Sequence, residues 1–238
     1  MSKLIAGQTV NTYAIQRMAT KARLHGMADN TWEGIPKIRK RSGELTKCLP
    51  APQTTEYSVP EGITKISQNA FVPCASDKVD TRYHNPVERI SLPASMETVA
   101  PSAFGCCFFL EAIEVDGNNM FFQSIDGVLF SKDGKKLLAF PAGRMEENYV
   151  VPEGVEVIGE NAFQNSCVYQ ITMPSTLKEI EDDAFWFSYS TVVDLSKATV
   201  EKVGKRIFDD VADMTVITKQ NCFGDGWENV TFKMIESI

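Results

Sequence analysis

Residues 151–163 read Val-Pro-Glu-Gly-Val-Glu-Val-Ile-Gly-Glu-Asn-Ala-Phe, and this stretch decides the fold. Close variants of it recur at residues 59–71, 92–104 and 173–185, and a degenerate copy runs through residues 200–208. The Phe that ends each copy stands at position 71, 104, 163, 185 or 208, so the copies are 33, 59, 22 and 23 residues apart. A unit of 22–23 residues with two insertions predicts a solenoid, in which each unit packs only against its neighbours.

A short alternating segment precedes each copy and predicts a β-strand. In Arg89-Ile90-Ser91-Leu92, for example, Ile90 and Leu92 share one face of the strand and Ser91 lies on the other. The Pro that follows ends the strand because it has no amide hydrogen to donate to a ladder, and Pro-Glu-Gly predicts a turn. The apolar residues later in the unit follow no strict period, so we expect a short irregular or helical return to the next strand.

These units resemble those of the BspA-like leucine-rich repeat family, which is found in bacterial surface proteins and some protist proteins. In that family a strand ends in Leu-Pro and is followed by Val-x-x-Ile-Gly-x-x-Ala-Phe, which residues 155–163 match almost position for position. Cys74, Cys107 and Cys167 stand three or four residues after a Phe, where the family often has Cys. The resemblance covers residues 59–218 and implies a leucine-rich-repeat solenoid of the β-rich α/β horseshoe type, with parallel strands stacked at each repeat.

Apolar strands that flank Asp-Gly turns in residues 124–137 predict a β-hairpin, and the family that the repeat resembles has a similar insert. Val230, Phe232 and Met234 alternate with polar residues, which predicts a last strand. The expected parts of the chain are an N-terminal basic arm or cap (1–58), the solenoid (59–218, with an insertion at about 116–150) and a C-terminal capping strand (219–238).

Residues 12–28 predict a helix with one apolar face, and four basic residues precede Asp29 without an acidic one. A membrane-surface helix, a transit peptide and a partner-docking arm all fit this composition. A cap is favoured because solenoids need their open ends covered. The first residues do not form a secretory leader. We therefore expect a cytoplasmic protein if the chain is complete, and a cell-surface or secreted one if a leader was removed.

The composition is that of a soluble globular protein, with 43% hydrophobic and 23% charged residues. No run approaches the roughly 20 apolar residues of a membrane span. The net charge of −7 divides into +6 for residues 1–50 and −13 for the rest, and such an acidic body repels the phosphates of nucleic acids. Six cysteines without a Cys-x-x-Cys pair favour reduced, packed thiols over a disulfide scaffold or a zinc site.

The sequence contains no recognisable catalytic arrangement. His25 and His84 lie outside the repeat copies, and neither belongs to a motif that pairs it with a nucleophile. Packing of the repeat accounts for the adjacent Cys106 and Cys107, and a solvated turn accounts for the acidic run at residues 181–183. We therefore expect no enzyme activity, no cofactor and no metal site.

One face of the strands is left as the candidate binding surface. Each strand residue between two buried neighbours points outward, and strands stacked about 4.8 Å apart align these residues into a ladder. Solenoids commonly use such a face for recognition. The candidate binding residues are Arg89, Ser91, Glu114, Tyr169, Gln170, Thr172 and Asp194. The insertion is a rival contact site, because insertions form surface loops that often carry function.

Together these observations favour a non-catalytic module that binds another protein or other macromolecule, with cell-surface adhesion as one form of that function. An intracellular scaffold is the alternative, and it accounts better for the missing leader and the unpaired cysteines. An enzyme without a recognisable motif is the weakest of the three hypotheses. No motif in the chain names the partner.

Overall fold

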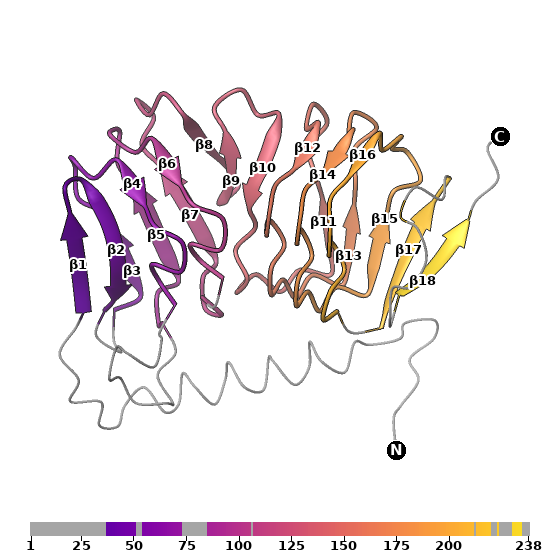
Figure 1. The fold of residues 1–238 in the computed structure, drawn as a ribbon, viewed down its shortest axis with the longest axis horizontal. Helices are drawn as coiled ribbons and strands as arrows, with labels where there is room; N and C mark the ends of the chain where they lie inside the picture. Colours follow the sequence, from indigo (N-terminus) through magenta and orange to yellow (C-terminus); the bar gives the residue numbers. More distant parts are fainter. Residues whose placement is uncertain are drawn as a thin grey trace, which may run out of the picture.

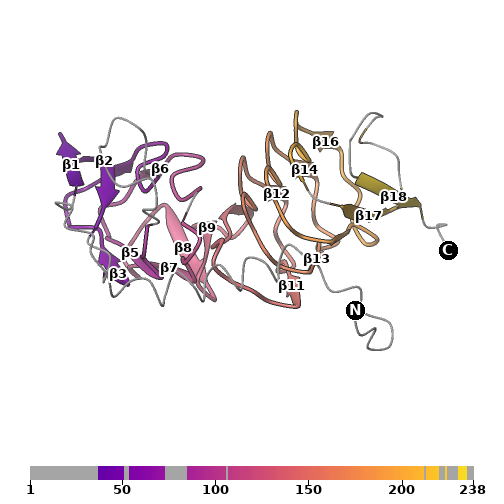
Figure 2. The same cartoon turned by 90° about the horizontal axis from the view of Figure 1, so that it is seen from below.

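The computed structural model describes residues 37–50, 54–72, 85–105, 107–211, 213–219, 223 and 230–234. The helix expected at residues 12–28, both histidines, Cys74 and Cys106 lie outside the described residues. The described residues form strands β1 to β18 and contain no helix. They therefore include no helix that is long and apolar enough to cross a membrane. The chain winds into a solenoid with strands on two opposite sides (Figure 1, Figure 2).

Most turns of the solenoid place a longer strand on one side and a shorter one on the other. The longer strands form two separate sheets, one of β3 (Glu56–Ser58), β5 (Arg89–Leu92) and β7 (Ala112–Val115), the other of β11 (Asn148–Val150), β13 (Gln170–Thr172), β15 (Val192–Asp194), β17 (Met214–Thr218) and β18 (Val230–Met234). On the opposite side one sheet contains β1 (Lys37–Arg41), β2 (Glu44–Leu49), β4 (Lys65–Ile66) and β6 (Thr98–Val99), and another contains β8 (Phe122–Ile125), β9 (Val128–Ser131), β10 (Lys136–Ala139), β12 (Val157–Ile158), β14 (Glu179–Ile180) and β16 (Lys202–Val203). We call these the long-strand side and the short-strand side.

The described parts of the returns contain no helix, so the irregular alternative of the prediction fits them and the helical one is not confirmed. A residue with a left-handed backbone occurs two positions before the Phe of every copy. These residues are Asn69, Ser102, Asn161, Asp183 and Arg206, with φ between 51° and 58°. Such a residue cannot continue a right-handed helix, and Asn and Asp adopt this conformation most readily. Two-residue strands and tight turns therefore form the return.

The Phe that ends each copy lies at the centre of the core. The ring of Phe163 has Phe140 on one side and Phe185 on the other, with centroids 5.3 Å away in both cases. The amide of Phe140 donates to Ala162 O at 2.7 Å, the bond that links each Phe to the next turn. Phe140 thus occupies the Phe position of a further copy. β10 pairs with β12 on the short-strand side, and β11 pairs with β13 on the long-strand side. This part of the segment at 116–150 is therefore repeat structure.

The hairpin of β8 and β9 divides the interior into two cores. Its turn is Asp126-Gly127, in which both residues have positive φ, as a type I′ turn requires, and the expected hairpin is confirmed. In β9, Val128 and Phe130 belong to the C-terminal core, whereas Leu129 between them belongs to the N-terminal core. β9 is therefore buried on both faces rather than part of a surface loop, as apolar residues on both faces of a strand imply. Residues 116–121 of the same insertion are mostly exposed, as the prediction of a surface loop requires. We call this hairpin the wall.

The wall also interrupts the long-strand side. β7 and β11 are consecutive long strands, yet each ends a separate sheet. β7 bonds the wall instead: the Ile113 amide donates to Gly127 O at 2.8 Å, and Ile113 O accepts from Ser124 Oγ at 2.7 Å. The molecule therefore has an N-terminal half (residues 37–115) and a C-terminal half (residues 136–234), with the wall between them.

Candidate binding face

The outward side of the long-strand sheets, which we call the ladder face, carries the candidate residues. The central residue of a strand, such as Ile90, is fully buried, and the residues on either side of it point outward. Parallel pairing aligns these outward residues between strands, so that Ser91 lies beside Glu114 and Thr172 lies beside Asp194. This is the alignment that period-two alternation predicts.

The wall splits the expected single ladder in two. Tyr169 stands one residue before β13 and is half-buried, and its carbonyl accepts from the amides of Thr191 and Val192 at 2.9 and 3.0 Å. The other candidates divide between the sheets, with Arg89, Ser91 and Glu114 in the N-terminal half and Gln170, Thr172 and Asp194 in the C-terminal half. The two groups therefore form separate surfaces.

Sequence reasoning missed outward residues that β11 and β17 contribute. β11 places Asn148 beside Gln170 and Val150 beside Thr172. A signal for this strand was present, since Asn-Tyr-Val-Val-Pro at residues 148–152 has the same order of strand and Pro as the recognised copies. The strand lies immediately before the recognised copy at residues 151–163, just as β13 lies immediately before the copy at residues 173–185.

The ladder face of the C-terminal half is nearly uncharged. Val150 is 64% exposed, which is high for an apolar side chain. The two outward rows consist of Asn148, Gln170, Val192, Thr215 and Thr231, and of Val150, Thr172, Asp194, Ile217 and Lys233. Side chains without charge cost far less to remove from water than ionised ones. A partner can therefore bury this surface with a small desolvation penalty.

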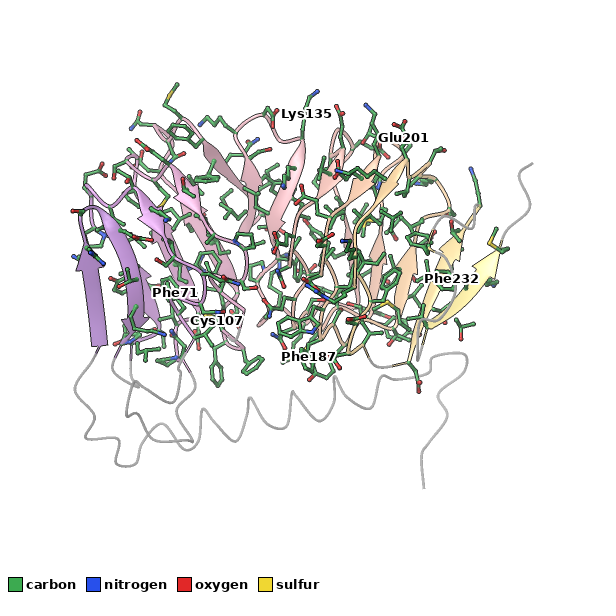
Figure 3. The ribbon with its side chains drawn as sticks, viewed as in Figure 1. Phe71, Cys107, Lys135, Phe187, Glu201 and Phe232 are labelled. Atoms are coloured by element: carbon green, nitrogen blue, oxygen red, sulfur yellow. The ribbon has the colours of Figure 1, made fainter. Side chains whose placement is uncertain are left out.

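The short-strand side of the same half carries rows of alternating charge. Lys135, Glu156, Lys178 and Glu201 occupy equivalent positions in successive turns, and backbone bonds of 2.7 or 2.8 Å join each to the next. Lys135 and Glu201 mark two positions of this edge in Figure 3. The Glu156 carboxylate lies 2.8 Å from Nζ of both Lys135 and Lys178, whose hydrogen bonds and charges lower its pKa to about 2. A partner that covered this edge would have to desolvate ion pairs that already hold successive turns together.

A groove of about 450 Å³ lies on the long-strand side where the two halves meet. On one side Arg89 and Glu114 form an ion pair at 3.0 Å. On the other, Arg144 donates to the carboxylates of Asp126 and Glu146. Burial works to lower the pKa of Arg144, but these two carboxylates outweigh burial and raise it. Both guanidinium groups of the groove are thus engaged in ion pairs.

A smaller cavity of about 140 Å³ lies on the short-strand side of the junction, beside β6 and β10. Gln164 lines this cavity, is only 8% exposed, and has an Oε1 without a hydrogen-bond partner among the described residues. Asn165 Nδ2 donates to Gly105 O and so joins the two halves. A Cβ on Gly105 would lie 2.5 Å from Gln164 Oε1, so a larger residue at this position would require the Gln164 side chain to move.

The cysteines of the described residues pack in the core. Cys48, Cys107 and Cys167 are buried, and burial raises the pKa of the Cys48 thiol to about 12. No group of three or more His, Cys, Asp or Glu gathers as a metal site within the described part of the chain.

Parallel ladders around stacked Phe rings, repeated every 22–23 residues, define a leucine-rich-repeat protein. The chain belongs to the BspA-type leucine-rich repeat family, because the family model of a BspA type leucine-rich repeat region, in six copies, matches residues 47–136 and 138–225. A leucine-rich repeat protein from Eubacterium ventriosum has a similar structure, with a TM-score of 0.61 and 21% identity over 75% of this chain and 48% of that one. The pneumococcal vaccine antigen PcpA is similar with a TM-score of 0.50 and 21% identity, over 75% of this chain and 54% of that one. The chain thus spans about half the length of these two proteins. Comparison with curated proteins gives no match.

Proposed function

We propose that the chain is a non-catalytic protein-binding module and that the ladder face of its C-terminal half is the contact surface. The observation that carries this proposal is the contrast between the two sides of that half. The short-strand side is occupied by ion pairs between turns, whereas the ladder face presents mainly uncharged side chains, including the exposed Val150. Interface cores are depleted in charge, so the ladder face is the better contact surface.

The candidate residues Gln170, Thr172 and Asp194 lie inside this surface. Val150 borders it on one side, and β17 and β18 continue it on the other. The candidates of the N-terminal half lie beyond the groove and contact only a partner that spans it.

Cell-surface adhesion is the setting that the resemblance to surface proteins favours. An intracellular scaffold is the second candidate, and the buried Cys48 favours it, because a thiol outside any disulfide is typical of reducing compartments. Labelling of intact cells with an impermeant reagent separates the two settings, since only a surface protein is labelled.

The binding face is tested by capture from cell-surface and cytosolic extracts with immobilised protein. The face variant carries Thr172→Arg and Thr215→Arg, on β13 and β17. The control carries Glu201→Arg on the exposed short-strand side, which changes the net charge by the same two units. We expect a partner that wild type and control retain and the face variant loses. A partner retained by all three refutes the contact surface, and the lack of any partner in either extract counts against a protein-binding role.

A further inference from the structure

Strand β11 lies in the middle of the long-strand side (Figure 1), and among the described strands it pairs only with β13. The Gln170 amide donates to Glu147 O and the Val151 amide to Thr172 O, both at 3.0 Å. These bonds identify the main-chain groups of β11 that face β13. In a parallel ladder alternate residues direct their main-chain groups to opposite edges, so those of Tyr149 also face β13. The amides and carbonyls of Asn148 and Val150 therefore point toward the junction. No hydrogen bond from another described residue reaches these four groups.

The neighbouring edge of β7 does not use this space. Ile113 on that edge already bonds Gly127 and Ser124 of the wall. The wall therefore provides hydrogen-bond partners for this edge of β7, and β11 is left as the end strand of its sheet.

The edge of β11 also lacks the protection found on the other end strands. Exposed edges are usually guarded by charged side chains, above all Lys. β3 carries Glu56 and β18 carries Lys233, whereas β11 reads Asn-Tyr-Val and ends in Val150, 64% exposed. Nothing in the side chains of β11 opposes pairing with a further strand.

The charge of the groove beside β11 indicates which charge an added strand should carry. Its charged lining consists of the carboxylates of Glu111, Glu114, Asp126 and Glu146 and the guanidiniums of Arg89 and Arg144, a net charge of −2. Both guanidiniums are already paired, and the Asp126 side chain is 83% exposed. Acidic walls of this kind attract cationic side chains.

We propose that the open edge of β11 binds an extended basic segment of a partner protein by strand addition. The segment's main chain bonds the amides and carbonyls of Asn148 and Val150, and a Lys or Arg at its end reaches the groove carboxylates. Strand addition takes its affinity from main-chain bonds and its selectivity from alternate side chains. The edge uses the main-chain groups of Asn148 and Val150, whereas the ladder face uses side chains, so either site can fail without the other.

The probe is a fluorescein-labelled peptide, Lys-Thr-Val-Thr-Val-Thr-Lys with an amidated C-terminus, titrated into the full chain and followed by anisotropy. Two control peptides replace Lys with Glu, or carry N-methyl groups on alternate backbone amides. Hydrogen exchange measured by NMR reports on the Asn148 and Val150 amides. We expect binding of the Lys peptide alone, slower exchange at those two amides, and weaker binding as salt rises from 50 to 500 mM.

Val150→Pro removes the edge amide without removing a bond to β13, because the Val150 amide faces the junction. Val150→Thr is the matched control, since it keeps the amide and the branched shape. We expect Val150→Pro to weaken binding at least about fivefold, as one lost hydrogen bond implies, and Val150→Thr to change it less than about twofold.

The Thr172→Arg, Thr215→Arg variant should still bind the peptide. Should Val150→Pro misfold by circular dichroism, the N-methylated peptide tests the same bonds on wild type. Equal binding of the Glu or N-methylated peptide, unchanged exchange at both amides, or no binding at millimolar peptide overturns the proposal.

Discussion

Leu129 and Phe130 are adjacent in β9 and fully buried, yet they belong to cores on opposite sides of the wall. We predict that Leu129→Ala destabilises the N-terminal half and that Phe130→Ala destabilises the C-terminal half. Leu→Ala removes three carbon atoms, which is about 2.4 kcal/mol at about 0.8 kcal/mol for each buried carbon. The cavity left behind raises the loss to about 3–4 kcal/mol, and Phe→Ala costs about 3–5 kcal/mol.

Hydrogen exchange with mass spectrometry measures each half separately. A loss of about 3 kcal/mol in the free energy of opening speeds exchange about a hundredfold, since about 1.4 kcal/mol is tenfold. We expect this acceleration in β5 and β7 for Leu129→Ala, and in β13 and β15 for Phe130→Ala. The opposite half should change less than about tenfold, because turns of a solenoid couple mainly to their neighbours.

Lys132→Ala is the control, because Lys132 is exposed in the same part of the chain and should leave both halves unchanged. Equal acceleration of both halves by either variant would refute the reasoning. The two clusters would then unfold as one cooperative core, and the wall would not separate them.

Glu156→Gln should destabilise the protein at pH 7 but not at pH 2. Lys135 and Lys178 lower the folded-state pKa from 4.5 to about 2, so the ionised carboxylate stabilises the fold above about pH 4.5 and this contribution is lost as the pH falls to about 2. Urea unfolding of both proteins across that range should show the difference shrinking, whereas a constant difference would contradict the assignment. Gln164→Met should raise the free energy of unfolding by about 1 kcal/mol, because it removes a buried carbonyl without a partner and keeps the shape of the side chain. A fall in thermal midpoint would show that the amide is satisfied. Cys48 should react with iodoacetamide at pH 8 far more slowly in the native protein than in urea, because burial raises the pKa of its thiol to about 12. Rapid labelling of the native thiol in a mass-spectrometric time course would contradict its burial.

The strand pattern was predictable because alternation in a strand depends only on neighbouring residues. Ile90 faces the core and Ser91 faces outward, as their order in the sequence implies. The turn Asp126-Gly127 was predictable for a similar reason, since this pair favours the positive φ that a two-residue hairpin needs.

For other features, the local sequence was compatible with two different structures. The apolar run Val128-Leu129-Phe130 fits a strand buried on both faces, but it also fits one strand of a surface hairpin. Asn161 fits a helical return by composition, but its left-handed backbone ends any helix at that point. Choosing between such readings requires knowing what packs against each face.

The repeat length, the Phe core and the outward position of residues such as Ser91 could be predicted from the sequence alone. These follow from short-range periodicity and side-chain size, which act within one turn of the solenoid. Only the tertiary structure decided that the hairpin forms an internal wall, that the ladder face is split and that β11 keeps an open edge. Each of these depends on which strands pair across the junction, and no pattern within a single repeat specifies that pairing.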